Sequence, residues 1–204
     1  MPKRKIKTLV AYANQRDIDT TAPLYPKERD AEVNRCKNEQ SRREKHLAWK
    51  LLEKIVSEHL KLDFANLQFT KNDNGKWGCS DFHFSITHTD GLVCVAVSDL
   101  PIGVDAELVR GINEALCTRM LTKSEMNSFA QIEGERKNRY LLEMWVKKES
   151  IFKKGSGKML MPNRIEASEH SADLRSVMLG GREYLISVAS DYDDKIEFIY
   201  LEDL

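Results

Sequence analysis

The spacing of apolar positions predicts helices in three parts of the chain. Residues 41–60 form the first, a long amphipathic helix. Its apolar positions are Leu47, Leu51, Leu52, Ile55 and Val56. Residues 112–120 have a second helical pattern, and Thr122 and Glu125 match a capping box that starts another helix. The strongest pattern covers residues 139–154 and stops at the Gly-Ser-Gly of residues 155–157.

From residue 82 the apolar period changes from helical spacing to two, which is typical of strands. Residues 82–88 alternate, residues 92–97 are continuously apolar and residues 102–108 alternate again. Turns are expected at the Asn-Asp-Asn-Gly of residues 72–75 and between these strands. Two further strands are expected at residues 184–189 and 196–201, joined as a hairpin by an Asp-rich turn.

This order of elements favours an α+β fold over a doubly wound sheet, because the strands follow one another without crossover helices. Each half of the chain has a helix-rich portion followed by strands. We therefore expect a pseudo-two-fold pair of similar halves, residues 1–100 and 101–204, each with a long helix packed on an antiparallel sheet.

Composition excludes some classes of protein. Apolar residues make up 41% of the 204 residues, enough for a core, and 32 basic residues balance 32 acidic ones. The zero net charge argues against a general nucleic-acid or membrane-surface binder. No apolar run is long enough to cross a bilayer, and the basic start is not followed by a signal-peptide core. The four cysteines form no close pair, so we expect free thiols and a cytoplasmic protein.

Two acidic side chains share one face of the predicted strand at residues 102–108. Asp105 and Glu107 alternate with apolar residues, and Gly103 on the same face leaves room for a ligand or a backbone. The simpler interpretation is the solvated outer face of an edge strand.

A third carboxylate lies in the helix predicted at residues 139–154. Glu149 falls on the arc that carries Leu141, Leu142 and Trp145, where a carboxylate is costly unless it meets a cation or is protonated. An ordinary helical pair of Glu149 with Lys153 would explain the spacing but not this apolar position.

If Asp105, Glu107 and Glu149 converge, they form a site of hard oxygen ligands suited to Mg²⁺ or Mn²⁺, and Mg²⁺ commonly binds substrate phosphates. His88 ends a strand between two threonine hydroxyls, so it is a candidate phosphate donor or else a satisfied structural histidine.

Three motifs together resemble the 4′-phosphopantetheinyl transferases of the long, single-chain, surfactin-synthetase type. They are Ser85-Ile-Thr-His-Thr89, Pro101-Ile-Gly-Val-Asp105-Ala-Glu107 and Trp145-Val-Lys-Lys-Glu149-Ser-Ile-Phe-Lys153. Gly75-Lys76 occupies the place of a Gly-Lys-Pro turn in that class. Each motif is weak alone, but their order and spacing are specific in combination.

The resemblance implies an enzyme that transfers the phosphopantetheine arm of coenzyme A to a carrier-protein serine and releases adenosine 3′,5′-bisphosphate. It implies an active site between the halves, in which Asp105, Glu107 and Glu149 hold Mg²⁺ against the pyrophosphate. His88 and Lys153 would stabilise its charge. Glu149 is the candidate base for the serine, directly or through a metal-bound water.

The resemblance also assigns coenzyme A contacts to further residues. Ser85 and Thr87 would line the phosphate region with His88, Asp105 and Lys153. Lys71 and Lys76 would lie near the adenine and ribose phosphate, and Arg35 and Arg43 would meet the 3′-phosphate. The partner would be an acyl carrier protein or a carrier domain of a fatty-acid, polyketide or peptide synthase, with no nucleic acid or membrane, and the protein a monomer.

Some positions depart from the family pattern. Trp77 replaces the usual proline after Gly75-Lys76, which changes the expected pocket for the adenine. Thr87 and Thr89 replace commoner serines, and the hydroxyl groups are kept. Two alternatives remain at this point. One is a non-catalytic module that binds coenzyme A or a carrier protein with the same fold, and the other is a structural or nucleic-acid-associated protein.

Overall fold

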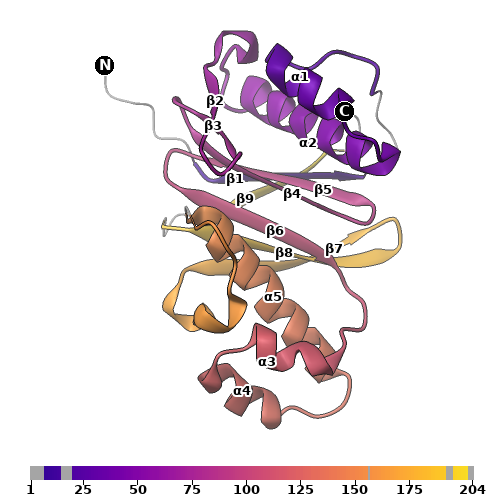
Figure 1. The fold of residues 1–204 in the computed structure, drawn as a ribbon, viewed down its shortest axis with the longest axis vertical. Helices are drawn as coiled ribbons and strands as arrows, with labels where there is room; N and C mark the ends of the chain where they lie inside the picture. The colour runs from indigo at the N-terminus through magenta and orange to yellow at the C-terminus, as the bar shows by residue number, and fades with distance from the viewer. Residues whose placement is uncertain (1–6, 15–19, 156, 192–194, 202–204) are drawn as a thin grey trace. The chain divides into compact units, whose positions relative to one another are not determined.

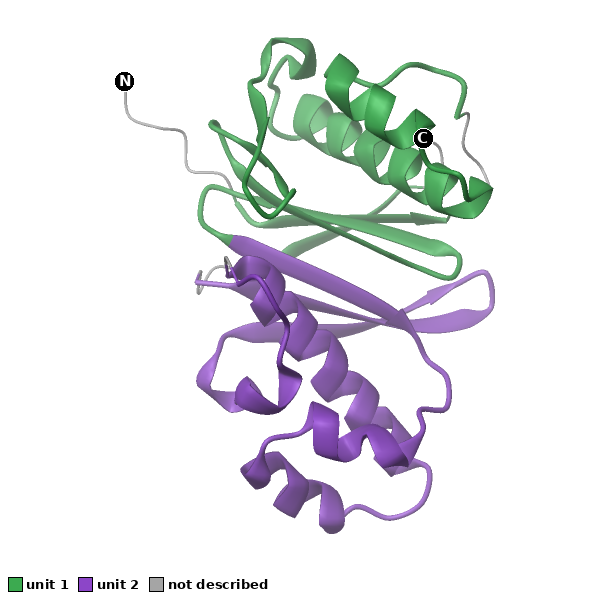
Figure 2. Cartoon of the chain, viewed as in Figure 1, with its two compact units in different colours: residues 1–101, 192–204 green, residues 102–191 purple. Residues whose placement is uncertain are grey.

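The computed structural model describes residues 7–14, 20–155, 157–191 and 195–201. The chain divides into two compact units, drawn in two colours in Figure 2. Unit 1 contains residues 1–101 and 192–204, and unit 2 contains residues 102–191. The basic residues 1–6 and Ser156 of the expected helix stop lie outside the described residues.

A four-stranded sheet with the order β4-β5-β1-β9 forms the centre of unit 1 (Figure 1). Its strands are β1 (Leu9–Asn14), β4 (His83–Thr89), β5 (Leu92–Ser98) and β9 (Glu197–Leu201). β1 and β4 both pair antiparallel with β5, whereas β9 pairs parallel with β1. The sheet is therefore mixed rather than purely antiparallel, and β1 and its pairing with β9 are features that the sequence analysis did not predict.

The predicted helix over residues 41–60 is α2 (Glu39–Glu58), which follows the shorter α1 (Lys27–Asn34). The Asn38 side chain caps α2 by accepting a hydrogen bond from the Ser41 backbone N–H at 2.8 Å. The apolar stripe of α2 packs on β1, β4 and β5, and it includes Leu51 and Ile55, which are fully buried. This packing forms the core of unit 1.

The Asn-Asp-Asn-Gly segment forms the predicted turn. It joins β2 (Phe69–Lys71) to β3 (Trp77–Cys79) in a two-stranded antiparallel hairpin. The Asn72 side chain accepts hydrogen bonds from the backbone N–H groups of Asn74 and Lys76. Gly75 has a φ of 76°, a left-handed conformation that glycine adopts without strain.

Unit 2 contains a three-stranded antiparallel sheet with the order β6-β8-β7. The strands are β6 (Ile102–Leu108), β7 (Ala172–Leu179) and β8 (Arg182–Ser190). The expected hairpin between the last two strands is wrong, because β8 pairs with β6 and β7 while β9 belongs to the sheet of unit 1. β7 supplies the hairpin partner of β8, and its pattern of half-exposed residues gave no clear strand signal.

The helices of unit 2 are α3 (Cys117–Met120), α4 (Lys123–Ala130) and α5 (Arg136–Lys154). The capping box at Thr122 and Glu125 is present at the start of α4, as the sequence predicted. Short 3₁₀ helices lie at Phe64–Asn66, Glu114–Leu116, Pro162–Arg164 and Ala167–Glu169. α5 packs along β6, β8 and β7, and its C-cap is Gly155.

The mixed α and β content agrees with the expected fold class. None of the described helices combines the length and apolarity that a membrane span requires. The four cysteines, Cys36, Cys79, Cys94 and Cys117, are free thiols, as expected.

Candidate active site

Strand β6 presents Gly103, Asp105 and Glu107 to helix α5. A Cβ atom at Gly103 would lie 1.9 Å from the Ser150 carbonyl oxygen and 2.5 Å from the Lys154 backbone nitrogen. The helix backbone therefore approaches the strand more closely than any side chain would allow. Asp105 is only 5% exposed, so the interpretation of this face as a solvated outer surface is wrong.

Replacing Gly103 by alanine should destabilise the protein, because α5 must move away from β6 to admit the new methyl group. Overpacking of this kind costs roughly 3 kcal/mol, measurable by urea denaturation. Gly111→Ala is the control, since nothing lies within 4 Å of its added Cβ. Equal and small losses in both variants would show that α5 does not need the missing side chain.

Helix α5 carries the aromatic and acidic residues of the site. Leu141 and Leu142 are buried, and the half-buried Trp145 packs beside them, as the helical arc predicted. The Trp145 indole Nε1–H donates a hydrogen bond to Glu107 Oε1 at 3.4 Å, which links helix and strand. Glu149 lies one turn further along α5 and is half-buried.

The charged side chains of β6 and α5 are close enough to pair with one another and to shift the pKa of Glu149. Lys153 Nζ pairs with Asp105 Oδ1 at 2.6 Å. Burial raises the pKa of Glu149 above its usual value, the negative charges of Asp105 and Glu107 raise it further, and Lys153 opposes them. The three acids and Lys153 thus share one electrostatic environment, and Lys153 contacts Asp105 rather than forming only a helical pair with Glu149.

The donor set of this cluster fits a hard divalent cation. Three carboxylates face one ammonium group, so the cluster carries excess negative charge, which Mg²⁺ or Mn²⁺ would neutralise through oxygen ligands. Within the described residues, however, no three His, Cys, Asp or Glu side chains are close enough to form an assembled metal cluster. Asp105, Glu107 and Glu149 are the residues that would hold such an ion.

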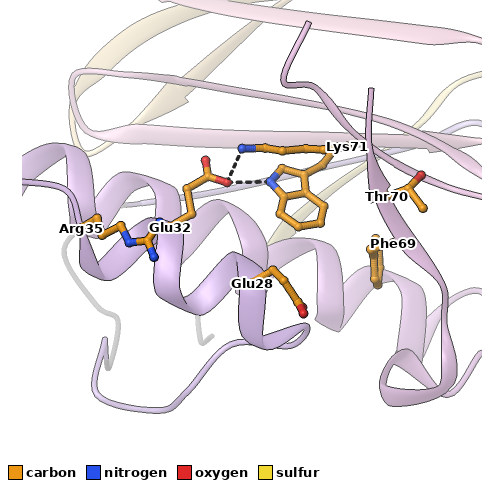
Figure 3. A pocket seen from close by; sticks show the side chains of 7 residues that line it. Glu28, Glu32, Arg35, Phe69, Thr70 and Lys71 are labelled. Carbon is orange, nitrogen blue, oxygen red and sulfur yellow. Dashed lines mark hydrogen bonds and ion pairs between the residues drawn. The ribbon is translucent and has the colours of Figure 1, made fainter. Parts of the chain in front are cut away.

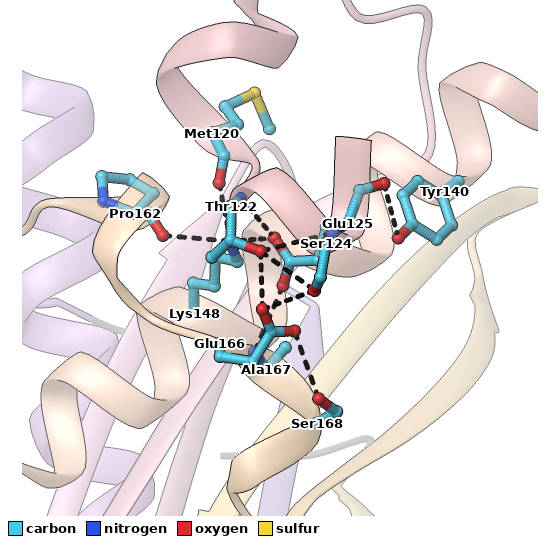
Figure 4. Close-up of polar contacts among 10 residues, drawn as sticks. All are labelled: Met120, Thr122, Ser124, Glu125, Tyr140, Lys148, Pro162, Glu166, Ala167 and Ser168. Carbon is cyan, nitrogen blue, oxygen red and sulfur yellow. Dashed lines mark hydrogen bonds and ion pairs between the residues drawn. The ribbon is translucent and has the colours of Figure 1, made fainter. Parts of the chain in front are cut away.

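A buried ion pair next to Glu149 fixes the loops around α5 (Figure 4). Lys148 is fully buried and pairs with Glu125, the capping residue of α4. Its Nζ also donates to the carbonyl oxygens of Met120 at 2.8 Å and Pro162 at 3.0 Å. The opposite oxygen of Glu125 accepts from the Ala167 backbone N–H at 3.2 Å. Helix α5 is thereby held to three segments of unit 2.

His88 lies on strand β4 of unit 1, on the face that meets α2. Its Nδ1 is 3.2 Å from Oε2 of Glu44, a helix residue that the sequence analysis did not identify. Ser85 and Thr87 are buried, and strand alternation puts them on the opposite face of the sheet from His88. The expectation that all three line one region is therefore not met within unit 1.

A pocket of about 400 Å³ lies between α1 and the β2–β3 hairpin of unit 1 (Figure 3). Its lining contains Arg35 and Lys71, the predicted cations, together with Trp77 and two carboxylates, Glu28 and Glu32. Neither carboxylate belongs to a motif that marks it in the sequence as part of a site.

Glu32 organises this pocket. Its Oε2 accepts hydrogen bonds from Lys71 Nζ at 2.7 Å and from Trp77 Nε1 at 2.9 Å. Burial acts to raise the pKa of Glu32, but these two hydrogen bonds and the positive charge of Arg29 outweigh it and lower the pKa. The Lys71 ammonium also lies 5.4 Å from the centre of the Trp77 ring. Trp77, which replaces the proline of the family pattern, is thus a fixed wall of the pocket.

The remaining predicted cations are on the surface of unit 1. Arg43 is exposed on α2, next to Glu44 in sequence, and Lys76 is exposed at the hairpin turn before Trp77. Neither contributes to the lining of the pocket, which takes Lys71 from the hairpin and Arg35 from the C-cap of α1.

Comparisons with known proteins find relatives that share one family name. Residues 101–195, which include β6, α5 and β8, match the family model described as the 4′-phosphopantetheinyl transferase superfamily. Three curated relatives carry names of the same kind. "4'-phosphopantetheinyl transferase ffp" of Bacillus subtilis is 29% identical over 55% of this chain and 51% of its own length. "4'-phosphopantetheinyl transferase psf-1" of Bacillus pumilus is 27% identical over 68% of this chain and 61% of its own.

The third, "4'-phosphopantetheinyl transferase Sfp" of Bacillus subtilis strain 168, is 26% identical over 55% of this chain and 51% of its own length. The chain thus matches between half and two thirds of the length of these relatives. The family model covers Asp105, Glu107 and Glu149 of the charge cluster, and Lys153. Over residues 101–195 the chain is therefore similar to the 4′-phosphopantetheinyl transferase superfamily, in agreement with the resemblance that its motifs predicted.

Proposed function

We propose that the protein transfers the 4′-phosphopantetheine group of coenzyme A to a serine hydroxyl of a carrier protein. The serine oxygen attacks the phosphorus next to pantetheine, the pyrophosphate bond breaks, and adenosine 3′,5′-bisphosphate leaves. The serine proton passes to a base. The observation that carries this proposal is the charge cluster of Asp105, Glu107, Glu149 and Lys153 in the part of the chain that matches the family.

Unit 2 would supply the groups for the pyrophosphate. Asp105, Glu107 and Glu149 would hold Mg²⁺, or Mn²⁺ in its place, which would neutralise the pyrophosphate when bound. Lys153 would move its ammonium from Asp105 to a phosphate oxygen and stabilise the charge of the leaving group. Glu149 is the candidate base, because its raised pKa makes it a better proton acceptor than an ordinary glutamate.

Unit 1 would supply groups for the remaining parts of coenzyme A. Arg35 and Lys71 would serve the adenosine end in the pocket that Trp77 walls, and Lys76 of the hairpin turn would contact the same end of coenzyme A. Arg43 would contact the 3′-phosphate, and His88 a phosphate of the bridge. We further propose that the protein acts as a cytoplasmic monomer on the carrier of a fatty-acid, polyketide or peptide synthase.

The test is mass spectrometry of a purified apo acyl carrier protein incubated with this protein, coenzyme A and Mg²⁺. We expect the carrier to gain the mass of one phosphopantetheine, and the gain to disappear with EDTA. Peptide-synthetase carrier domains are a second set of acceptors. Binding of coenzyme A without transfer to any acceptor would contradict the proposal and indicate a binding module.

The 3′-phosphate assignment gives a further prediction. Arg43→Ala should raise the KM for coenzyme A about tenfold, which corresponds to one charge-assisted hydrogen bond. The KM for 3′-dephospho-coenzyme A should hardly change, because that donor lacks the phosphate. Steady-state kinetics with both donors measure the difference, and equal effects on both would show that Arg43 does not recognise this group. Arg42→Ala is a matched control, because Arg42 is held by Glu39 at 2.9 Å.

The metal site can be tested without catalysis. Millimolar Mg²⁺ should raise the melting temperature of the protein, because an ion bound only by the folded state stabilises it. Glu107→Gln should reduce this shift, since it removes one of the three charges. Differential scanning fluorimetry measures the effect. A shift of the same size in the variant would place the ion elsewhere.

A further inference from the structure

Glu32 is held at both carboxylate oxygens in the pocket between α1 and the β2–β3 hairpin. Its Oε2 accepts hydrogen bonds from Lys71 Nζ at 2.7 Å and from Trp77 Nε1–H at 2.9 Å, drawn as dashed lines in Figure 3. Its Oε1 accepts from Arg29 Nη1 at 3.1 Å. Arg29 is buried and also donates through Nη2 to the Lys45 carbonyl oxygen at 3.3 Å. The orientation of the Glu32 carboxylate is therefore fixed from within unit 1.

These contacts limit what the pocket offers to an anionic ligand. The charge of the Lys71 ammonium is already paired with Glu32, and the single N–H of the Trp77 indole is used by the same oxygen. The lining holds two cations and two carboxylates: Arg35, Lys71, Glu28 and Glu32. A phosphate group beside Lys71 would therefore lie close to a carboxylate that repels it, and the balanced charges of the lining would give it no net electrostatic gain.

The rest of the lining suits an uncharged planar ring. Phe69 and Trp77 contribute aromatic side chains, and a volume of about 400 Å³ is within the range of pockets that bind small organic ligands. The Trp77 ring is fixed by its N–H contact, and it packs against Trp49 with ring centres 5.7 Å apart. Proline, the residue of the family pattern at this position, has no side-chain N–H and could not make the contact with Glu32.

We infer that Glu32 is a positioning residue that sets the specificity of this pocket: it occupies Lys71 and holds Trp77, so that the pocket binds an uncharged nucleobase and disfavours phosphate groups. The inference rests on the proposed function for the identity of the base, which is the adenine of coenzyme A. It goes beyond that function by placing the phosphates of the donor outside this pocket. The separate assignment of the 3′-phosphate to Arg43 is consistent with it, because Arg43 does not line the pocket.

The test is nuclear magnetic resonance of the full chain with ¹⁵N-labelled tryptophan, in the absence of Mg²⁺. The three tryptophans give three indole N–H signals, and Trp77→Phe identifies the signal of Trp77. The uncharged probe is adenosine and the anionic probe is inorganic phosphate, titrated at matched ionic strength. In the native chain we expect adenosine to shift the Trp77 signal and phosphate to leave it unchanged.

Replacing Glu32 should change this preference. In Glu32→Ala the Lys71 ammonium loses its carboxylate, so the affinity for phosphate, measured at Trp77, should rise about tenfold. The affinity for adenosine should fall, because the ring is no longer held. Glu32→Gln removes the charge but keeps an oxygen that accepts from both donors, so it should gain phosphate binding and retain adenosine binding. Glu28→Gln is the matched control, since it removes the same charge from the lining while Lys71 stays paired, and it should still disfavour phosphate.

Three results would overturn the inference. They are phosphate binding at Trp77 in the native chain, the same preference in the native chain and both Glu32 variants, and a Trp77 signal that adenosine does not shift. The carrier-protein assay tests the proposed function separately. A native chain that selects adenosine at Trp77 but transfers no phosphopantetheine would contradict the proposed function and leave the role of Glu32 intact.

Discussion

Replacing Glu149 by glutamine should reduce the rate of transfer by about 10³-fold while the fold is kept. The variant removes a metal-binding charge and the candidate base but keeps the shape of the side chain. Its melting temperature should equal or exceed that of the native protein, because burial and the charges of Asp105 and Glu107 already disfavour the ionised form of Glu149. Loss of activity combined with full stability would separate a catalytic role from a structural one.

The measurement is single-turnover modification of the carrier protein, with circular dichroism and thermal melting on the same samples. Glu143→Gln is the matched control, since Glu143 lies earlier on α5 and pairs with Arg139 at 3.1 Å. We expect that variant to remain active. Near-normal turnover by Glu149→Gln would remove this residue from the mechanism, whatever the behaviour of Asp105 and Glu107.

The largest loss of stability is expected for Lys148→Met. This change removes the buried ammonium and leaves the Glu125 carboxylate and the carbonyls of Met120 and Pro162 without their shared donor. Breaking one side of a buried ion pair costs about 3–5 kcal/mol. Urea denaturation should show a lower midpoint with an unchanged slope.

Two further variants serve as controls. One tests the loss of a lysine, and the other tests the Glu125 carboxylate that has lost its buried cation. Lys147→Met changes a half-exposed neighbour and should have little effect. Lys148→Met combined with Glu125→Leu should recover part of the stability, because no buried carboxylate then lacks its cation. A double variant as unstable as the sum of its parts would show that the pair acts independently.

Local patterns predicted much of the fold. The helical period placed α2 and α5 within a few residues, and Thr122 and Glu125 identified the start of α4. Strand alternation put Asp105 and Glu107 on one face, with Gly103 as the point of close approach. These features depend on residues near one another in sequence, so the sequence alone contains the necessary information.

Features that depend on distant partners could not be predicted in the same way. β8 and β9 follow one another in the sequence and look like a hairpin. In the structure, β8 pairs with β6 and β7, whereas β9 pairs with β1. Glu44 lies in a run of charged residues that resembles a solvated helix face, and only its contact with His88 distinguishes it. Lys148 looks like an exposed lysine of α5 until its three acceptors are known.

The pairing of β1 with β9 has a consequence for the order of folding. The sheet of unit 1 uses strands from before and after unit 2 in the sequence, so unit 2 is an insertion between β5 and β9. Its first and last strand residues, Ile102 and Ser190, are register partners on neighbouring strands. Once unit 2 is folded, it therefore acts as a short connection, which lowers the entropic cost of joining β9 to β1 by about 2 kcal/mol. On the ribosome, β9 is made after unit 2, so unit 1 gains this edge strand only after unit 2 has been synthesised.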